Sequence, residues 1–577
     1  KADQVSWLRL FIFLAGAVLA GWFFYEGNNL FGFGSLVIFY AVFIVVMRWH
    51  NRLQYTRDHN RILSEINREE IMRLNGELKV FDAGDRFKDA QHPYTSDLDI
   101  FGPHSLFAVL NRGVTSLGKN QLAAWLQTAA PAPEIIARQE VLQEIAPEVE
   151  WRQELQANAR HYLRKVEKMP DLLQWLEEPE FFKGKKWLIG LTFLLPILTL
   201  AAIAGWYYDL SSGYWVGGLA LAQYLINIKY AAQKESIREK SDELNEELRS
   251  YVSVLEHLEK REYKSAKLMN LRQELFLQQS PASGFVKGLS SLLDFLAVTQ
   301  NAYMNFLLNN LLMWDFFWLW RLDIWKQSTT GNLERILHTV AEAEALASLA
   351  AFAFANPDNA MPQISAEPFE VAGTEIGHPL IFAETRISNS FATAGPGKTV
   401  IITGSNMSGK STFLRTVGIN MALTFAGSVV SAKTFKAYPI QLFTAMRTED
   451  NLAESTSSFY AELKRLKMLL DLTEKGTPVF YFLDEILKGT NSRDRHLGAV
   501  ALVKQLHQRS ASGFISTHDL ELGQLENEMP QSVSNYSFNS TIEGDKIIFD
   551  YRLQPGLCRS FNASKLMQLM GIAIAEG

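Results

Sequence analysis

The sequence contains very little cysteine: Cys558 is the only one among 577 residues. A single thiol excludes an intrachain disulfide and, without companions, a zinc site built from several thiolates. We therefore expect Cys558 to be a small buried apolar residue. This sparing use of cysteine agrees with a protein that works in a reducing compartment.

The chain also lacks a strong excess of charge of either sign. Its formal net charge is −6 and its pI is near 6.1. A strongly basic chain would indicate nucleic acid as a partner, and this chain gives no such indication, although a local basic face remains compatible with it. Composition alone therefore does not indicate whether the chain binds DNA.

Four long apolar stretches have almost no charged residues: 10–25, 30–47, 187–208 and 210–228. The last three reach about 18 residues or more, which is enough to cross the hydrocarbon core of a bilayer. The first does so if Trp7 and Leu8 are included and Arg9 extends to the interface. We interpret each pair as a transmembrane hairpin, because uncharged runs of this length are unusual as core helices of a soluble fold. A cleavable signal peptide is an alternative for the first run, but the immediate second span argues against it.

Lysine and arginine are missing from the turns inside both hairpins and gather at their outer ends. These flanking residues are Arg48, Arg52, Arg57, Arg61, Lys183, Lys185, Lys186, Lys229 and Lys234. By the positive-inside rule, both hairpins enter the membrane from the cytoplasm and return to it. We therefore expect a multi-pass protein of the cytoplasmic (inner) membrane, held in the lipid bilayer by four transmembrane helices, with the remainder in the cytoplasm.

Residues 403–412 fit the pattern of a phosphate-binding loop. An apolar run precedes them and a helix-forming segment follows them, as this motif requires. Glycines let successive backbone N–H groups face phosphate oxygens, and the helix N-terminus adds positive potential. The pattern predicts that a nucleoside triphosphate is bound here, with Lys410 on the outer phosphates and Ser411 as a Mg²⁺ ligand. The predicted binding residues are Gly404, Ser405, Asn406, Met407, Ser408, Gly409, Lys410, Ser411 and Thr412.

Two further apolar runs end in residues that suit nucleotide hydrolysis. Residues 479–483 lead into Asp484 and Glu485, and residues 513–517 lead into His518. Because open α/β folds bind ligands at the carboxyl edge of the parallel sheet, these side chains are expected to meet there. Asp484 would hold the metal through water and Glu485 would polarise the attacking water. Taken singly, His518 is more often an ordinary capping or core histidine; the combination points to hydrolysis.

The regions between these motifs predict helices. Residues 51–78 carry an Ile/Leu stripe typical of a helix near the membrane face. In residues 231–277, Leu244, Leu248, Tyr251, Leu255 and Leu258 recur at spacings of four and three. This spacing predicts a long helix packed on a partner helix, or equally a satellite helix of one compact bundle.

The aromatic stretch 306–325 resembles a fifth span in hydrophobicity. Asp315, Arg321 and Asp323 would be costly in lipid, so we expect a buried core helix. An aromatic platform for stacked bases is a weaker alternative.

The nucleotide motifs resemble those of the MutS family, whose ATPases belong to the ABC class. Residues 403–412 are similar to the family's TGPNMGGKST loop, with Ser405 in place of Pro and Ser408 in place of Gly. Similar segments are also found at 377–380 (the His-Pro motif), 450–462 (DDLA…STF…E), 483–492 (DEIGRGTS) and 516–518 (the ATH switch), and less specifically at 97–126 (the opening of the helical core).

The resemblance implies a homodimer that binds ATP and Mg²⁺. Each ATP would lie between the phosphate loop of one subunit and the segment containing Ser457 and Ser458 of the other. Lys410 and Ser411 would bind phosphate and Mg²⁺, and Asp484 would support the metal. Glu485 would orient or deprotonate water, and His518 would sense the outer phosphate. Double-stranded DNA is the candidate partner.

The expected fold class is a multidomain α and α/β protein with transmembrane helical hairpins, an all-α core/lever domain and a C-terminal P-loop ABC-type ATPase domain. Expected domains are hairpin 1 (1–50), a juxtamembrane helix with the first half of the core (51–182), hairpin 2 (183–230), the second half of the core (231–361), and the ATPase domain with C-terminal dimerisation helices (362–577). No segment before residue 81 resembles the family's mismatch-reading domain, and hairpin 2 stands where mismatch-repair members insert a DNA clamp.

We therefore expect a membrane-anchored MutS-like ATPase that acts on DNA through an ATP-dependent dimeric clamp, without support for mismatch recognition itself. One alternative is an ATP-driven transport or mechanochemical device, although the spans lack the charges that mark a substrate path. Another alternative is a non-hydrolysing membrane scaffold or DNA tether.

Overall fold

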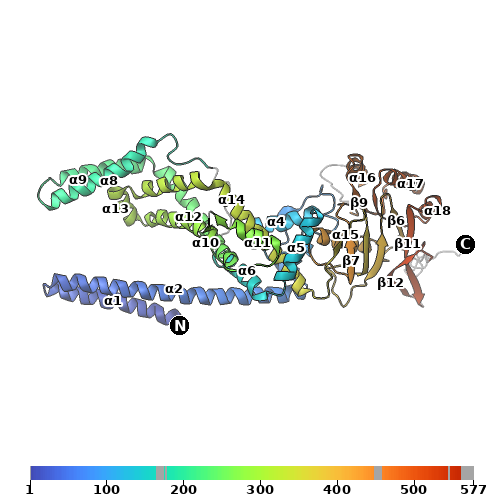
Figure 1. The fold of residues 1–577 in the computed structure, drawn as a ribbon, viewed down its shortest axis with the longest axis horizontal. Helices are drawn as coiled ribbons and strands as arrows, with labels where there is room; N and C mark the ends of the chain where they lie inside the picture. Colours follow the sequence, from blue (N-terminus) through green and yellow to red (C-terminus); the bar gives the residue numbers. More distant parts are fainter. Residues whose placement is uncertain are drawn as a thin grey trace. The chain divides into compact units, whose positions relative to one another are not determined.

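The structure is a computed structural model that describes residues 2–163, 175, 178–277, 279–447, 458–543 and 546–559 (Figure 1). The chain forms two compact units. Unit 1 comprises Lys1–Ile71, Gln153–His257 and Ser283–Thr330, and unit 2 comprises Met72–Arg152, Leu258–Ala282 and Gly331–Gly577. Because each unit is assembled from separate stretches of sequence, this division does not test the domain boundaries expected above, which stay predictions.

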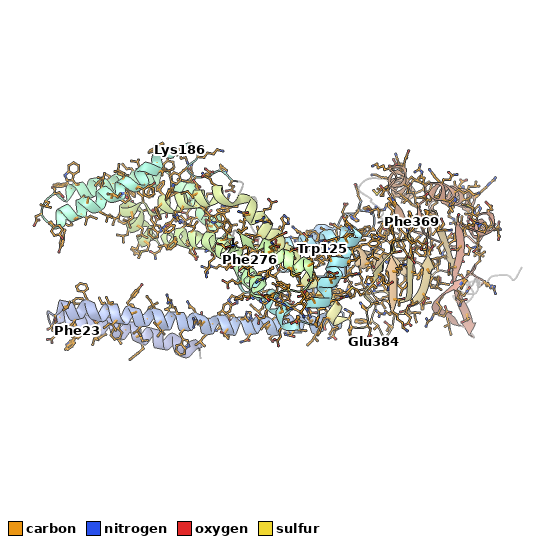
Figure 2. All side chains as sticks on the ribbon, viewed as in Figure 1. Phe23, Trp125, Lys186, Phe276, Phe369 and Glu384 are labelled. Carbon is orange, nitrogen blue, oxygen red and sulfur yellow. The ribbon has the colours of Figure 1, made fainter. Side chains whose placement is uncertain are left out.

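Unit 1 begins with two antiparallel helices, α1 (Ala2–Tyr25) and α2 (Asn29–Leu74). They approach closely because Gly16 faces Phe39 and Gly32 faces Phe24. Figure 2 shows Phe23 at the end of the pair where the helices join, stacked on Phe31. The second apolar run and the predicted juxtamembrane helix form one helix of 46 residues, since no glycine or proline interrupts the chain between them.

The second apolar pair forms α8 (Lys186–Tyr207) and α9 (Tyr214–Lys229). The turn between them extends to Gly213, so α9 has 16 residues and is shorter than the run 210–228. At 1.5 Å per residue it spans about 24 Å, less than the roughly 30 Å hydrocarbon core.

By length and composition, three helices among the described residues are long and apolar enough to cross a membrane: Leu30–Leu74, Lys186–Tyr207 and Gly331–Ala355. The third has 83% of its most apolar window buried inside the protein and is therefore a core helix. Helix α1 has 24 residues, and the part of it whose burial is described, Phe11–Tyr25, is an apolar helix of fewer than 18 residues. Two of these three candidates are exposed, and they are identified by composition alone, so the four transmembrane helices stay a prediction.

The remaining helices of unit 1 surround buried apolar stripes. They include α6 (Val149–Leu163), α10 (Ala231–Lys260), α12 (Ala282–Ala297), α13 (Ala302–Leu312) and the first part of α14 (Trp314–Ala355), which belongs to unit 2 from Gly331 on. The predicted stripe on α10 is confirmed, since Leu244, Leu248, Tyr251, Leu255 and Leu258 are all buried. The single core helix expected at 306–325 is wrong: Met313, with φ of 50°, separates α13 from α14, and Phe306 is 69% exposed.

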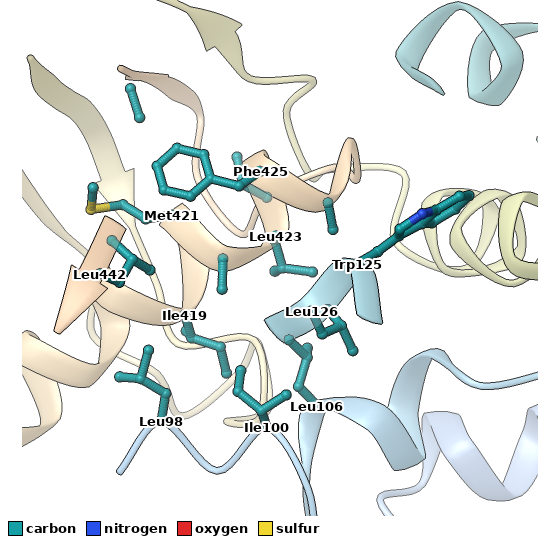
Figure 3. Close-up of a cluster of buried hydrophobic side chains, with 14 of the residues drawn as sticks. Leu98, Ile100, Leu106, Trp125, Leu126, Ile419, Met421, Leu423, Phe425 and Leu442 are labelled. Atoms are coloured by element: carbon teal, nitrogen blue, oxygen red, sulfur yellow. The ribbon is translucent and has the colours of Figure 1, made fainter. Parts of the chain in front are cut away.

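Unit 2 joins short helices to an α/β fold through one apolar core. The helices are α3 (Leu106–Leu110), α4 (Ser116–Gln127), α5 (Ala132–Ile145) and α11 (Ala266–Glu274). Figure 3 shows Leu106 and Leu126 of this helical part on the side of Ile419 and Leu423 of α15 (Lys410–Ala426), and all four belong to one buried cluster. The helical segment that opens with residue 97 therefore packs directly on the helix that follows the phosphate-loop motif.

Two sheets build the α/β part. The larger has the order β12-β11-β6-β10-β9-β8, in which all neighbours except β11 and β12 are parallel. Its strands are β6 (Thr399–Gly404), β8 (Gln441–Ala445), β9 (Val479–Asp484), β10 (Ser512–Thr517), β11 (Val533–Glu543) and β12 (Lys546–Pro555). The smaller has the order β3-β7-β4-β5, formed by β3 (Gln363–Ile364), β4 (Val371–Ile376), β5 (Asn389–Thr393) and β7 (Thr434–Ala437).

Helices α15, α16 (Ser458–Glu474) and α17 (Ser492–Gln508) connect strands of the larger sheet. Strands β6, β9 and β10 are almost entirely buried, as expected for parallel strands covered on both faces. The three strands expected from the apolar runs are confirmed, and they lie next to one another.

Candidate functional site

The loop between β6 and α15 has the backbone geometry that the phosphate-loop motif requires. Gly409 has a φ of +105°, a conformation that L side chains rarely adopt. A Cβ at Gly404 would lie 2.7 Å from Ser408 Oγ and 2.8 Å from the Phe538 carbonyl oxygen. Both positions therefore need glycine.

Lys410 lies at the centre of the site, with its side chain 4% exposed. Its Nζ donates to the carbonyl oxygens of Gly404 and Ser405, each at 3.1 Å. It lies 3.4 Å from His518 Nε2 and 3.9 Å from Glu485 Oε1. Burial lowers the pKa of Lys410, and the carboxylates of Glu485 and Asp484 oppose that shift.

The ends of β9 and β10 bring Asp484, Glu485 and His518 to the same sheet edge, as predicted. Asp484 pairs in register with Ser516, whose hydroxyl donates to its carboxylate. The backbone N–H of Glu485 donates to the Ser516 carbonyl oxygen at 2.9 Å. Glu485 has a φ of +50°, uncommon for a residue with a side chain, and lies where the strand turns away from the sheet.

The Glu485 carboxylate is held by two neighbouring side chains. His518 Nε2 lies 2.8 Å from Oε1, and Lys488 Nζ lies 3.1 Å from Oε2. These contacts, with the His518 hydrogen bond the largest, lower the pKa of Glu485 to about 2. The group is therefore a fully ionised acceptor at neutral pH, next to the phosphate loop.

Glu462, on α16, supports this arrangement from behind. Its carboxylate accepts a hydrogen bond from the backbone N–H of Leu487, two residues beyond Glu485. Burial raises the pKa of Glu462, while this backbone hydrogen bond opposes the shift. The sequence comparison matched Glu462 to a family motif, but nothing in the local pattern indicated that it holds the turn after Glu485.

A cavity of about 240 Å³ opens beside the phosphate loop. Its lining includes Ile376, His378, Ile381, Thr385, Arg386, Ile387, Asn389, Gly409, Thr412, Phe413, Thr416, Phe538 and Tyr551. Such a mixture of apolar walls and a few polar groups is typical of small-molecule sites. Burial lowers the pKa of His378 to about 4, so this wall carries a neutral imidazole at neutral pH.

The cavity wall is assembled from distant parts of the chain. Asn389 donates to the Tyr551 carbonyl oxygen at 3.0 Å and accepts from the Leu553 N–H at 2.8 Å, which fixes β12 beside the 376–389 segment. Sequence reasoning missed this wall, apart from noting the His-Pro motif that contains His378.

The other predicted site residues lie where the motif places them, with one exception. Asn406 and Met407 are exposed at the loop tip, and Ser411 and Thr412 lie in the first turn of α15. Ser458 is the first residue of α16. Ser457 lies outside the described residues.

These residues fit a magnesium-bound triphosphate. Within the described part of the chain, the buried hydroxyls of Ser405 and Ser408 have no hydrogen-bond partner, so two donors remain available at the loop. The glycine cradle, the buried ammonium group and the carboxylate of Asp484 complete a donor set suited to phosphate and Mg²⁺.

Comparison with known proteins agrees with this chemistry. The MutS domain V family model matches residues 400–573. DNA mismatch repair protein MutS of Natronomonas pharaonis is 32% identical over 256 residues, 42% of this chain and 28% of that protein. The proteins of the same name from Thermotoga neapolitana and Thermotoga maritima are 33% identical over 239 residues and 31% identical over 245 residues, covering 29% and 30% of their lengths and 41% and 42% of this chain.

The matched part of this chain thus spans less than a third of each of these relatives. It includes the phosphate loop, Asp484, Glu485 and His518. The chain combines helical segments with an α/β fold whose C-terminal region is MutS-like.

Proposed function

We propose that this chain is a membrane-anchored, MutS-like ATPase that binds and hydrolyses Mg·ATP in a dimeric clamp and acts on DNA. The observation that supports it most strongly is the meeting of Lys410, Asp484, Glu485 and His518 beside a glycine cradle, in the region similar to MutS domain V. A buried cation, a metal-binding carboxylate and an ionised water-orienting carboxylate are the parts that phosphoryl transfer to water needs.

In this proposal, the triphosphate lies along the 404–411 loop, and the base and ribose occupy the cavity lined by Ile387 and Tyr551. Lys410 exchanges its bonds to the loop carbonyls for bonds to the outer phosphates. Ser411 would hold Mg²⁺ and Asp484 would support it, and the ion would supply positive charge to those phosphates. Glu485, ionised because its pKa is about 2, orients the attacking water. His518 fixes the direction of the Glu485 carboxylate.

A second copy of the chain would complete the site through Ser457 and Ser458. Hydroxyl and N–H groups at the start of α16 would add donors to the outer phosphate, so that ATP holds the two copies together. The relatives are named DNA mismatch repair proteins, which supports DNA as the partner. Mismatch reading itself is not part of the proposal, because the match covers less than a third of those proteins.

The membrane part of the proposal depends on the exposed apolar surfaces of α2 and α8 and on the basic residues that flank them. We place both hairpins in the cytoplasmic membrane and the nucleotide site in the cytoplasm.

ATP turnover by the full chain in detergent tests the proposal. Glu485→Gln keeps the shape of the side chain but removes the charge that orients water, so we expect turnover to fall on the order of 10²–10⁴-fold while ATP binding persists. The matched control is Glu474→Gln, the same change at a side chain 70% exposed on α16, which is expected to keep the wild-type rate. Wild-type turnover in Glu485→Gln would remove Glu485 from this role, and absence of turnover in the unmodified chain despite ATP binding would favour a scaffold.

A further inference from the structure

Helix α13 in unit 1 presents an apolar face that no other part of the described chain covers. Tyr303 is 85% exposed, Phe306 69%, Leu307 50% and Met304 45%. The sequence has no charged residue between Asp294 and Asp315. An uncharged helix with several large exposed apolar side chains on one side is unusual in a protein surrounded by water.

The C-terminal end of α13, in contrast, is polar and buried. Asn309 and Asn310 are 1% and 8% exposed. Asn309 Nδ2 donates to Asp315 Oδ2 at 2.8 Å, and its carbonyl oxygen accepts from Asn227 Nδ2 of α9 at 2.9 Å. The helix therefore exposes its apolar N-terminal half and buries its polar C-terminal end, the reverse of what a surface in water favours.

Helix α13 packs against α8 and α9 (Figure 1). The buried positions of this pair include Thr199 and Gln223, whose side chains hydrogen-bond to each other at 2.7 Å. Apolar side chains such as Ile197, 63% exposed, point outward. Inward polar pairs and outward apolar side chains are the arrangement expected where lipid replaces water.

A charged cluster closes one end of this group of helices. Asp315, 3% exposed, binds Lys234 Nζ at 3.0 Å and Arg238 at 3.2 Å, and accepts a hydrogen bond from Thr299 at 2.6 Å. Lys234 also donates to Asn227 at 2.7 Å, so the cluster connects α9, α10, α13 and α14. Charges that are paired and buried at the base of apolar helices suit the level where a membrane-embedded group meets the aqueous phase.

We propose that α13 is a third membrane-embedded helix of the second hairpin, with Tyr303, Phe306 and Leu307 in contact with lipid acyl chains. At 11 residues, about 16 Å, it is too short to cross the bilayer and enters one leaflet only. The inference rests on the proposed membrane anchorage and extends it to a segment whose sequence predicted a buried core helix. Lipid is the occupant because α13 packs against α8, the candidate span, whose exposed side chains are also apolar.

The single cysteine makes a direct test possible. In a Cys558→Ala background, one cysteine is introduced at a time by Phe306→Cys or, as a second α13 position, Leu307→Cys. Ile197→Cys reports on the α8 anchor, and Met269→Cys, at a side chain 48% exposed on α11, is the control outside the hairpin. Each full-length variant carries a nitrobenzoxadiazole label in phosphatidylcholine/phosphatidylglycerol liposomes, with or without doxyl-labelled lipid.

We expect doxyl lipid to quench the label at 306, 307 and 197 several-fold more than the label at 269, and aqueous iodide to give the opposite order. Quenching at 197 without quenching at 306 and 307 would contradict the inference about α13 while leaving the anchor intact. Absence of quenching at all three positions would overturn the membrane anchorage, and the inference with it. Protection of 306 and 307 from both iodide and doxyl lipid would show that protein covers this face, which also contradicts the inference.

Discussion

The side chains around Glu485 are arranged so that its carboxylate stays ionised and points in one direction. His518 and Lys488 contact the carboxylate, and the hydrogen bond from the Glu485 N–H to the Ser516 carbonyl oxygen fixes the backbone of this residue. Its Oε1 lies 3.9 Å from the Nζ of Lys410, at the end of the phosphate loop. At the scale of single residues, the site thus depends on groups that hold Glu485 as much as on Glu485 itself.

Replacing His518 by alanine tests this dependence through pH. The hydrogen bond from His518 is the largest cause of the low pKa of Glu485, so its loss should raise that pKa from about 2 toward the ordinary value of 4.5. A carboxylate with a depressed pKa is ionised above that pKa and loses its charge as pH falls through it. The acid limb of the pH profile of kcat/KM is therefore expected to move to higher pH in His518→Ala. The rate at pH 5 should fall by a larger factor than the rate at pH 8.

His518→Gln is the control, because its amide keeps a donor for Glu485 and should retain more of the acid-side rate. An acid limb in His518→Ala that stays in place, or moves to lower pH, would contradict the assigned role.

Site residues could be predicted from the sequence only where they belong to a short local motif. The glycine cradle and the residues directly after β9 and β10 follow from short motifs at strand ends, where the chemistry and the chain direction coincide. The cavity wall could not be predicted in this way, because Asn389 and Tyr551 are more than 160 positions apart in the sequence and meet only when the strands pack. Glu462 was recognised by resemblance alone, since a glutamate within a helix gives no local signal of the loop it supports.

At the scale of elements, periodicity predicted the existence and type of the strands and long helices, and it failed at helix ends. The apolar run 30–47 and the charged stretch after it differ in composition but contain no helix breaker, so they form the single helix α2. In the 306–325 stretch, a break occurs at Met313 without glycine or proline, where Asn309 binds both the N–H and the carboxylate of Asp315. Tertiary hydrogen bonds of this kind leave no mark on the hydrophobic pattern.

The cluster around Asp315 should dominate the stability of unit 1. Asp315→Ala leaves the buried ammonium of Lys234 without its carboxylate, which typically costs about 3–5 kcal/mol. We expect a clear fall in the Tm of the detergent-solubilised chain, partly restored by adding Lys234→Met. Asp294→Ala, which breaks the exposed pair with Arg249, is the control and should change stability by less than about 1 kcal/mol. Equal Tm values for the Asp315 and Asp294 variants would contradict this account.

At the scale of the whole molecule, the sequence motifs predicted a MutS-like nucleotide-binding fold. They did not predict which other segments of the chain belong to the same compact unit. Residues 72–152 and 258–282 join the α/β part because Leu106, Trp125 and their neighbours complete the core on α15. That packing is set by shape complementarity between distant segments, which no single stretch of sequence displays. The two exposed candidate spans, in contrast, are readable directly, since length and lack of charge are local properties.

The proposed action on DNA predicts a steep dependence on salt. Although the net charge is −6, a local basic surface would release counterions on contact with phosphates, so affinity should fall on the order of 10³-fold or more between 50 and 200 mM salt if six or more phosphates are bound. Retention of the detergent-solubilised chain on immobilised double-stranded DNA measures this. No retention at 50 mM salt, with or without ATP, would remove DNA from the proposal and leave the ATPase.

In the proposed function, the MutS-like region binds ATP at the 404–411 loop. Cryo-electron microscopy of the Glu485→Gln chain with Mg²⁺ and ATP tests it most directly. The account predicts a triphosphate along that loop, the Lys410 Nζ on its outer phosphates, and the base in the cavity beside Tyr551 and Ile387. A map at saturating ATP in which Lys410 stays on the carbonyl oxygens of Gly404 and Ser405, with no nucleotide at the loop, would contradict it.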